Sequence, residues 1–155
     1  MILAENARLR LRTMRCGDLE ELYALLSDAE VMRWLEPPFT REQAERFLQQ
    51  AGLSDPPLIY AAENAEGEFL GYAIYHDYDD RSRELGWVLR QSAWRKGYAG
   101  EMTALLTVLA RREGKDAVIE CTPEQTVSAH IARRHGFSYK GSANGLDIYR
   151  RQSTE

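Results

Sequence analysis

The sequence predicts an α/β domain with a mixed, mostly antiparallel central sheet. Three strand-like runs follow one another between residues 58 and 89, which is typical of an antiparallel meander. After them the pattern becomes helix, strand, helix and two further strands. A strand-helix-strand unit requires a crossover, so the strands that it joins should be parallel. At 155 residues, 44% of them hydrophobic, the chain has the size of one domain spanning 1–155.

The N-terminal third is predicted to contain one strand and two helices. Residues 8–13 alternate polar and apolar side chains, which indicates a half-buried strand. Two capping boxes predict helix starts, and they are formed by Asp18 with Glu21 and by Thr40 with Gln43. Between the helices, segment 31–39 contains a proline pair that cannot continue a helix. We expect it to be a rigid apolar connector.

The other elements are delimited by prolines, glycines and polar turns. The expected strands are 58–62, 69–78, 84–89, 118–121, 137–140 and 147–150. A helix over 101–112 has a buried stripe at Met102, Leu105, Leu106 and Leu109, and Gly114 marks its end. A second helix is expected over 125–135, stopped by Gly136.

Segment 94–100, with the sequence WRKGYAG, connects a predicted strand to a predicted helix. Its small residues allow a tight turn and leave backbone N–H groups uncovered at the positive end of the helix dipole. Its two basic residues add positive charge. These features predict a phosphate-binding loop formed by Arg95, Lys96, Gly97, Tyr98, Ala99 and Gly100. The alternative is an ordinary strand-to-helix turn capped by glycine.

A second segment, PEQTVS at 123–128, is followed by RRHGF at 133–137. Together with the loop it resembles the GNAT superfamily of acyl-CoA-dependent N-acetyltransferases. The chain looks most like the branch of ribosomal-protein N-terminal acetyltransferases (RimJ/RimL-like) and their small-molecule-modifying relatives. That branch shows a W-G-K-G-Y-A-T-E loop and a later P-E-N-x-x-S…G-F segment. Residues 8–12 and 28–35 also fit its N-terminal half, so the resemblance spans nearly the whole chain.

The resemblance implies a GNAT-like fold with a splayed parallel strand pair and helices on both faces of the sheet. In that family the strand before the phosphate loop binds the pantetheine arm of acetyl-CoA through free backbone groups. The matching residues are Trp87, Val88 and Leu89, and the loop would then meet the pyrophosphate. Gln125 stands where the family has an asparagine that contacts pantetheine. The longer side chain is expected to shift or lose that contact.

The general base has three candidates. Glu84 begins the splayed strand, and Glu120 lies on the next strand, where some ribosomal-protein acetyltransferases have a catalytic glutamate. A carboxylate among apolar neighbours has a raised pKa and suits proton abstraction. His76 is the third candidate. Each of these residues could instead have only a structural role, the glutamates as ion-paired edge residues.

The acid that reprotonates the leaving thiolate is not the usual one. Many GNAT enzymes have a tyrosine four residues before the Gly-Phe pair, and Ala132 occupies that position. Ser128 matches a serine of this branch and could donate a hydrogen bond to the sulfur. It could also simply bond backbone near a helix start.

Aromatic and acidic residues are candidates for the acceptor site. Those considered for its lining are Trp34, Tyr60, Tyr75, His76 and Tyr78. The acidic cluster Asp77, Asp79 and Asp80 could attract an amine, although charged runs in turns are usually just solvated.

We therefore expect direct acetyl transfer from acetyl-CoA to a primary amine, either a protein N-terminal α-amine or a small-molecule amine. The alternative is a non-catalytic acyl-CoA-binding module. The net charge of −4 argues against a nucleic acid partner. No apolar run approaches the ~20 residues of a membrane span, and two cysteines, Cys16 and Cys121, favour reduced thiols in the cytoplasm. No spacing indicates a metal site, and a homodimer is left open.

Overall fold

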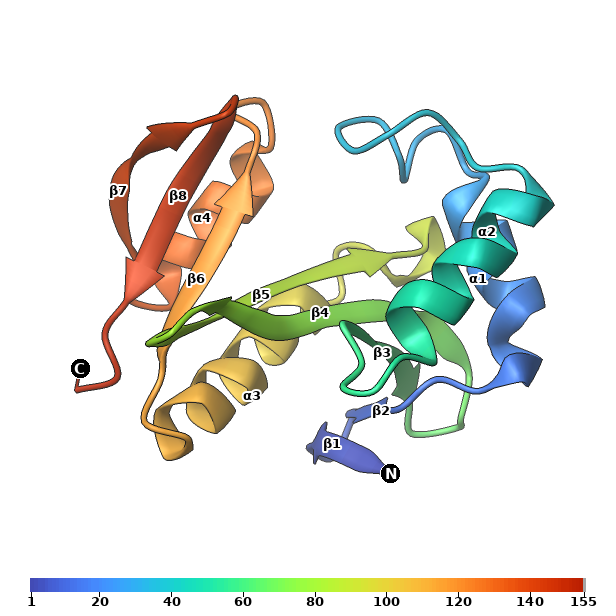
Figure 1. The fold of residues 1–155 in the computed structure, drawn as a ribbon, viewed down its shortest axis with the longest axis horizontal. Helices are drawn as coiled ribbons and strands as arrows, with labels where there is room; N and C mark the ends of the chain where they lie inside the picture. The colour runs from blue at the N-terminus through green and yellow to red at the C-terminus, as the bar shows by residue number, and fades with distance from the viewer. Residues whose placement is uncertain (155) are drawn as a thin grey trace.

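The computed structural model describes residues 1–154 and contains one mixed eight-stranded sheet with helices on both faces (Figure 1). In sheet order the strands run β1-β2-β3-β4-β5-β6-β8-β7. The strands are β1 (Ile2–Glu5), β2 (Leu9–Arg12), β3 (Ile59–Asn64), β4 (Phe69–Asp79), β5 (Ser82–Leu89), β6 (Asp116–Cys121), β7 (Ser138–Ala143) and β8 (Leu146–Arg151). The α-helices are α1 (Leu19–Leu26), α2 (Arg41–Phe47), α3 (Tyr98–Arg112) and α4 (Thr126–Arg134). The predicted fold class is confirmed.

All neighbouring strands are antiparallel except β5 and β6, which are parallel. This pair is in register only over Ser82–Glu84 and Asp116–Val118. Beyond those three residues β6 turns away from β5 and continues its pairing with β8 (Figure 1). The sheet is therefore open between β5 and β6 over the rest of their length.

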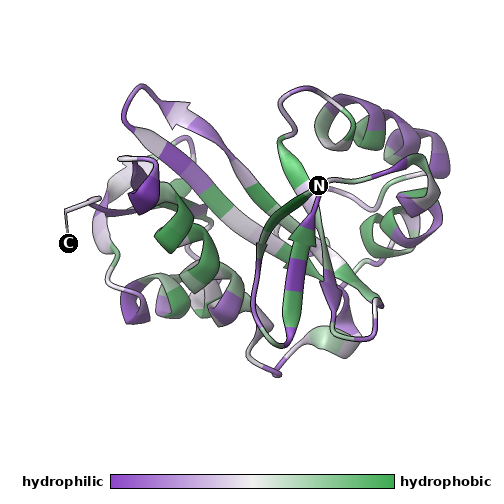
Figure 2. Ribbon diagram, turned by 90° about the horizontal axis from the view of Figure 1, so that it is seen from below, coloured by the Kyte–Doolittle hydropathy of each residue, from purple (hydrophilic) through white to green (hydrophobic). Residues whose placement is uncertain are grey.

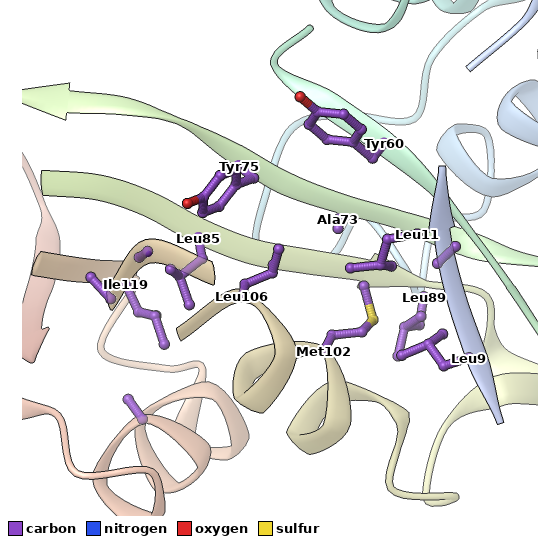
Figure 3. Close-up of a cluster of buried hydrophobic side chains, with 14 of the residues drawn as sticks. Leu9, Leu11, Tyr60, Ala73, Tyr75, Leu85, Leu89, Met102, Leu106 and Ile119 are labelled. Atoms are coloured by element: carbon purple, nitrogen blue, oxygen red, sulfur yellow. The ribbon is translucent and has the colours of Figure 1, made fainter. Parts of the chain in front are cut away.

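One core lies between the sheet and the helices that follow the meander. Met102 and Leu106 of α3 are fully buried, and they point towards Leu85 and Leu89 of β5 (Figure 3). The helices are striped in hydropathy, with hydrophobic positions turned towards the sheet (Figure 2). This periodicity is what the sequence shows for 101–112, and it explains why α3 covers this face.

A second core lies on the opposite face, under α1 and α2. Leu22 of α1 and Ala44 of α2 are fully buried there, and they pack in a cluster with Tyr72 of β4 and Val88 of β5. Side chains alternate between the two faces along a strand, so β4 and β5 supply both cores. No helix among residues 1–154 combines the length and apolar character needed to cross a bilayer.

The two predicted capping boxes have different outcomes. Thr40 and Gln43 exchange the expected bonds, with Gln43 N–H donating to Thr40 Oγ1 at 3.2 Å and Thr40 N–H donating to Gln43 Oε1 at 2.8 Å. The box at Asp18 is wrong. Asp18 instead accepts two 2.9 Å hydrogen bonds from the guanidinium of Arg12 and one from Arg15 N–H.

Asp18 belongs to a partly buried ion cluster that joins β2 to β3 and α1. Arg12 also donates through Nε to Glu63, at 2.9 Å. Burial alone would raise the pKa of Asp18, but the bonds from Arg12 and Arg15 lower it below its ordinary value. Asp18 therefore serves as the ion-pair partner of Arg12 and not as a helix cap. Helix α1 begins without a side-chain cap.

Strand β1 was not predicted, because its four residues show no alternation of buried and exposed positions. The second predicted helix is also modified, since α2 ends at Phe47 and the chain continues as a π-helical turn over Leu48–Gly52.

Gly71 is the point of closest approach between β4 and β5. Its φ is +148°, and an added Cβ would overlap the carbonyl oxygen of Val88 and lie 2.9 Å from Cα of Leu89. We expect Gly71→Ala to lower the free energy of unfolding by about 3 kcal/mol, because both obstacles are backbone atoms that cannot move aside. Chemical denaturation measures this change.

Gly17→Ala is the matched control, since nothing lies within 4 Å of an added Cβ there. Its effect should stay within about 0.5 kcal/mol. Equal stabilities for the two variants would contradict the close approach at Gly71.

Candidate active site

A cavity of about 400 Å³ opens where β5 and β6 diverge, and residues from both faces of the sheet line it. Side chains and backbone from both halves of the chain line it. The predicted site residues that it brings together are Trp34, Glu84, Trp87, Val88, Glu120, Gln125 and Ser128. The divergence of two parallel strands therefore collects residues that lie far apart in the sequence.

The backbone of β5 divides the three residues predicted to hold an acyl-CoA arm. The Val88 carbonyl faces Gly71 of β4, and Arg90 N–H donates to Leu70 of the same strand at 2.8 Å. Backbone groups alternate sides along a strand, so those of Trp87 and Leu89 face the gap towards β6. Trp87 is thus placed to offer its N–H and C=O there, whereas Val88 contributes its side chain to the cavity.

Leu89 also makes a contact that was not predicted. Its carbonyl accepts a 2.8 Å hydrogen bond from the indole Nε1 of Trp94, and it does not line the cavity. This bond ties the end of β5 to the start of the loop that follows. The Leu89 carbonyl therefore positions the loop, while the N–H of the same residue still faces the gap towards β6.

The predicted phosphate loop opens helix α3, which begins at Tyr98. Two of its residues adopt left-handed backbone conformations, Arg95 with φ 61° and Gly97 with φ 84°. The first N–H groups of a helix have no partner within the helix, and they lie at the positive end of its dipole. Helix α3 has 15 residues, so its N-terminus carries the partial positive charge of a long helix. The geometry matches an anion-binding turn.

Arg8, the residue before β2, binds this loop through its guanidinium group. Its guanidinium donates to the carbonyl of Lys96 at 2.7 Å and to Glu101 at 2.6 Å, and it stacks 4.5 Å from the ring centroid of Tyr98. Asn6 adds a 3.1 Å hydrogen bond to the same glutamate. With the Lys96 carbonyl turned towards Arg8, the opposite side of the loop is left for N–H groups.

Glu84 and Glu120 both line the cavity, close to where the strands separate. Burial raises the pKa of Glu84 above its ordinary value; the neighbouring charge of His76 opposes this and that of Glu120 adds to it. His76 lies opposite Glu84 on β4, and its Nδ1 is 2.9 Å from the carbonyl of Asp77. Glu84 therefore interacts electrostatically with both of the other predicted bases.

Tyr78 connects this group to the end of β4. Its hydroxyl donates to Glu120 Oε2 at 3.0 Å, reaching from β4 to β6 across β5. A register shift between Asp77 and Asp79 places the residue where it can do so. Burial, and then the bond to Glu120, raise the pKa of Tyr78, so the phenol keeps its proton at neutral pH and remains a donor.

Two aromatic residues considered for the acceptor site lie elsewhere. Tyr60 and Tyr75 belong to the core on the α3 face, away from the cavity. The hydroxyl of Tyr75 donates to Glu113, and burial followed by this bond raises the pKa of Tyr75. The prediction that Tyr75 lines the acceptor site is therefore not supported by its position. Strand alternation explains the error, since Tyr75 points to the opposite face from His76.

The acidic cluster at 77–80 serves to close the sheet at one end. Asp79 accepts hydrogen bonds from Ser82 and Arg150, at 2.7 and 3.3 Å. Asp77 pairs with Arg83, and the Asp80 carbonyl accepts from Lys115 at 2.8 Å. These bonds fasten the β4–β5 turn to β6 and β8, where the two parallel strands still pair.

Several lining residues were not predicted from the sequence. Glu36 and Phe39 come from the 31–39 connector, while Phe47 and Tyr72 come from α2 and β4. Three of the rings pack together, with centroids 6.0 Å apart for Phe39 and Phe47 and 5.8 Å apart for Phe47 and Tyr72. The proline pair in the connector signalled rigidity but not its path over the cavity.

Comparison with protein families gives a direct match. The model of the acetyltransferase (GNAT) domain matches residues 8–138, which include the loop, both glutamates and Ser128. This chain belongs to the GNAT acetyltransferase family. The predicted class, an N-acetyltransferase of the acyltransferase type, is thereby confirmed. A search of curated proteins returns no significant match.

Solved structures share the GNAT fold over the whole chain. A GNAT-family acetyltransferase from Bacillus anthracis has a TM-score of 0.88 at 22% identity, covering 100% of both chains. A Salmonella typhimurium acetyltransferase that modifies the N-terminal serine of a ribosomal subunit protein scores 0.82 at 19% identity, covering 98% of this chain and 99% of that one. The microcin C7 self-immunity acetyltransferase, solved with acetyl-CoA and AMP, scores 0.81 at 20% identity, covering 95% and 93%.

This GNAT domain departs from the family pattern on α4. Ala132, at the usual tyrosine position, is fully buried in the core, so no side chain there reaches the cavity. The side-chain oxygen of Gln125 accepts from Thr122 N–H at 2.8 Å, which folds the amide back onto its own turn. Ser128 does line the cavity. Within residues 1–154 no group of three His, Cys, Asp or Glu side chains is arranged to hold a metal.

The contribution of the Arg8 contacts to the shape of the loop can be tested without any ligand. We expect Arg8→Met to speed hydrogen exchange of the backbone amides of residues 95–100 about fivefold. The bonds to Lys96 and Glu101 are charge-assisted but partly exposed, so their combined effect is about 1 kcal/mol. Arg10→Met, which removes an exposed pair with Glu5, should leave these amides unchanged. Unaltered exchange in Arg8→Met would show that the loop holds its shape without these contacts.

Proposed function

We propose that this GNAT domain is an acetyl-CoA-dependent enzyme that transfers the acetyl group directly to a primary amine. The observation that carries the proposal is the cavity between β5 and β6, which combines free strand backbone with two carboxylates. Acetyl transfer from a thioester requires a neutral amine, a polarised carbonyl and close approach of the two. The α-amine of a protein N-terminus and a small-molecule amine are both acceptors of this kind.

The acyl-CoA would follow the open edge of β5. Backbone groups of Trp87 would pair with the amides of the pantetheine arm, as a further strand would. The pyrophosphate would then reach the first turn of α3 and the N–H groups of 96–100, with Arg95 and Lys96 supplying charge. Ser128 and Gln125, on the α4 side, border the same path.

The carboxylate of Glu84 or of Glu120 would remove the proton that keeps the acceptor amine charged. The neutral amine attacks the thioester carbonyl carbon and a C–N bond forms, which leaves the nitrogen positively charged. The C–S bond then breaks, CoA leaves as the thiolate, and the nitrogen gives up its proton to water, so that the amide, CoA thiolate and one proton are the products. A raised pKa makes the Glu84 carboxylate a stronger base than an ordinary glutamate. Tyr78 keeps Glu120 oriented towards the cavity through its hydrogen bond.

Ser128 would donate a hydrogen bond to the leaving sulfur; it lines the cavity from α4, whereas Ala132 has no donor and is buried. CoA thiolate is a fairly good leaving group, because its thiol pKa resembles the ~8.5 of free cysteine. A strong acid is therefore not required.

Both cysteines, Cys16 and Cys121, are free thiols, in keeping with our proposal of a reducing cytoplasmic compartment.

A non-catalytic acyl-CoA-binding module is the second candidate. It would account for the open strand edge and the loop, and the loss of the tyrosine acid favours it. It would not account for two carboxylates placed beside the divergence, because burial of Glu84 is unfavourable for a module that only binds a cosubstrate. Release of CoA from acetyl-CoA in the presence of an amine panel separates the two.

The loop tests the cosubstrate site. We expect Gly97→Val to weaken CoA binding tenfold or more, about 1.4 kcal/mol, because a β-branched residue cannot hold φ 84° and the loop must change shape. Calorimetric titration with CoA measures the affinity. Gly67→Val is the control, since Gly67 has φ 80° but lies in the β3–β4 turn. Unchanged CoA affinity in a folded Gly97→Val variant would contradict the phosphate site.

The carboxylates test catalysis. We expect Glu84→Gln or Glu120→Gln to lose about 10²-fold in kcat while binding acetyl-CoA normally, as general-base losses do. Steady-state rates with a saturating amine give kcat. Near-full kcat in both variants at neutral pH would exclude both glutamates as the base and leave water or His76.

Stability against pH provides the folding control for Glu84. Its pKa is higher in the folded than in the unfolded chain, so the folded state binds more protons between the two values. The contribution of Glu84 to stability is therefore lost as the pH rises through the folded-state pKa. Glu84→Gln should thus be at least as stable as the parent at pH 7, and any gain should shrink towards pH ~4.

A further inference from the structure

The cavity beside the diverging strands has two chemically different ends. One end, next to the strand separation, has the carboxylates of Glu84 and Glu120. The other end is formed by rings from three separate elements, Phe39, Phe47 and Tyr72. Trp34, 40% exposed, stands at the solvent side of the same lining.

The charged side chains that line the cavity are all acidic. A third carboxylate, Glu36, lines the cavity, and its charge together with burial raises the pKa of Tyr72. No lysine, arginine or histidine is among the lining residues in the described part of the chain. Two basic residues flank the lining: His76 lies opposite Glu84 on β4, and the guanidinium of Arg33 stacks 4.7 Å from the ring centroid of Trp34.

The aromatic end adjoins the path of the acyl-CoA, because Tyr72 is the cross-strand partner of Val88. That path follows β5 and α4, whereas the rings come from the connector, α2 and β4. Gly86 lies between Glu84 and Val88 on the cavity face of β5, and it leaves that face without a side chain. An added Cβ there would come within 3.2 Å of Ile74. The side chain of Ile74 therefore lies over Gly86, between the carboxylates and the rings.

We infer that the acceptor is a primary amine attached to an apolar or aromatic body, with no carboxylate beside the amine. This inference rests on the proposed acetyl transfer. The body packs against Phe39, Phe47 and Tyr72, while the ammonium group enters next to Glu84 and Glu120 and loses its proton there. A carboxylate on the acceptor is repelled by three like charges, and no lining cation compensates it.

Three small amines test both parts of the inference. They are 2-phenylethylamine, L-phenylalanine and ethylamine, each assayed with acetyl-CoA by CoA release. We expect kcat/KM for 2-phenylethylamine to exceed that for each of the other two at least tenfold. The basicity of the amines does not explain the preference over L-phenylalanine, because the amino acid holds its proton less tightly and is more often neutral. A Phe-Ala-Ala peptide amide presents the same chemistry on a chain and distinguishes a peptide source from a small molecule.

Two variants test whether Glu36 contributes to this substrate preference. Glu36→Gln should reduce the preference for 2-phenylethylamine over L-phenylalanine about threefold. Glu30→Gln, immediately before the connector and outside the lining, should leave it unchanged.

The outcomes separate this inference from the proposed function. If L-phenylalanine or ethylamine is used as well as 2-phenylethylamine, the acceptor class is wrong while acetyl transfer stands. If only peptides with polar first residues are acetylated, the acceptor class is likewise wrong. If no amine or peptide releases CoA, the proposed function itself is contradicted.

Discussion

The short parallel pairing of β5 with β6 is the constraint on which the rest of the site depends. Three residues of each strand pair, and then the strands separate. Polar contacts close the paired end, where Arg150 bonds Asp116 at 3.0 Å and Asp79 at 3.3 Å, and Asp116 N–H donates to the Arg81 carbonyl at 2.9 Å. With one end fixed, the other end opens and leaves strand backbone without a ladder partner. Such backbone is costly to bury unless a ligand satisfies it.

The second requirement is a loop of fixed shape next to that open edge. Two contacts set its shape from outside the loop, the indole of Trp94 on the Leu89 carbonyl and the guanidinium of Arg8 on the Lys96 carbonyl. The first satisfies the last carbonyl of β5, and the second satisfies a carbonyl within the loop. The loop is therefore organised by β5 and by Arg8 before β2, and the left-handed conformation of Arg95 is tolerated because these contacts define the conformation.

Much of this architecture could be predicted from the sequence, because it is written in local patterns. Helical periodicity gave α3, and the glycines and basic residues of 94–100 indicated the loop. Long-range contacts could not be predicted. Asp18 has the spacing of a cap but binds Arg12, and Tyr75 has the composition of a pocket residue but faces the core. In each case a partner distant in sequence, or the register of a strand, decided the outcome.

Backbone hydrogen exchange with and without CoA tests the central claim most directly. If the arm of the cosubstrate pairs with the open edge of β5 and its phosphates bind at α3, CoA should protect the amide of Trp87 together with those of 96–100. The amide of Val88, which faces β4, should change little. Protection of the loop without Trp87, or of neither, would contradict the account.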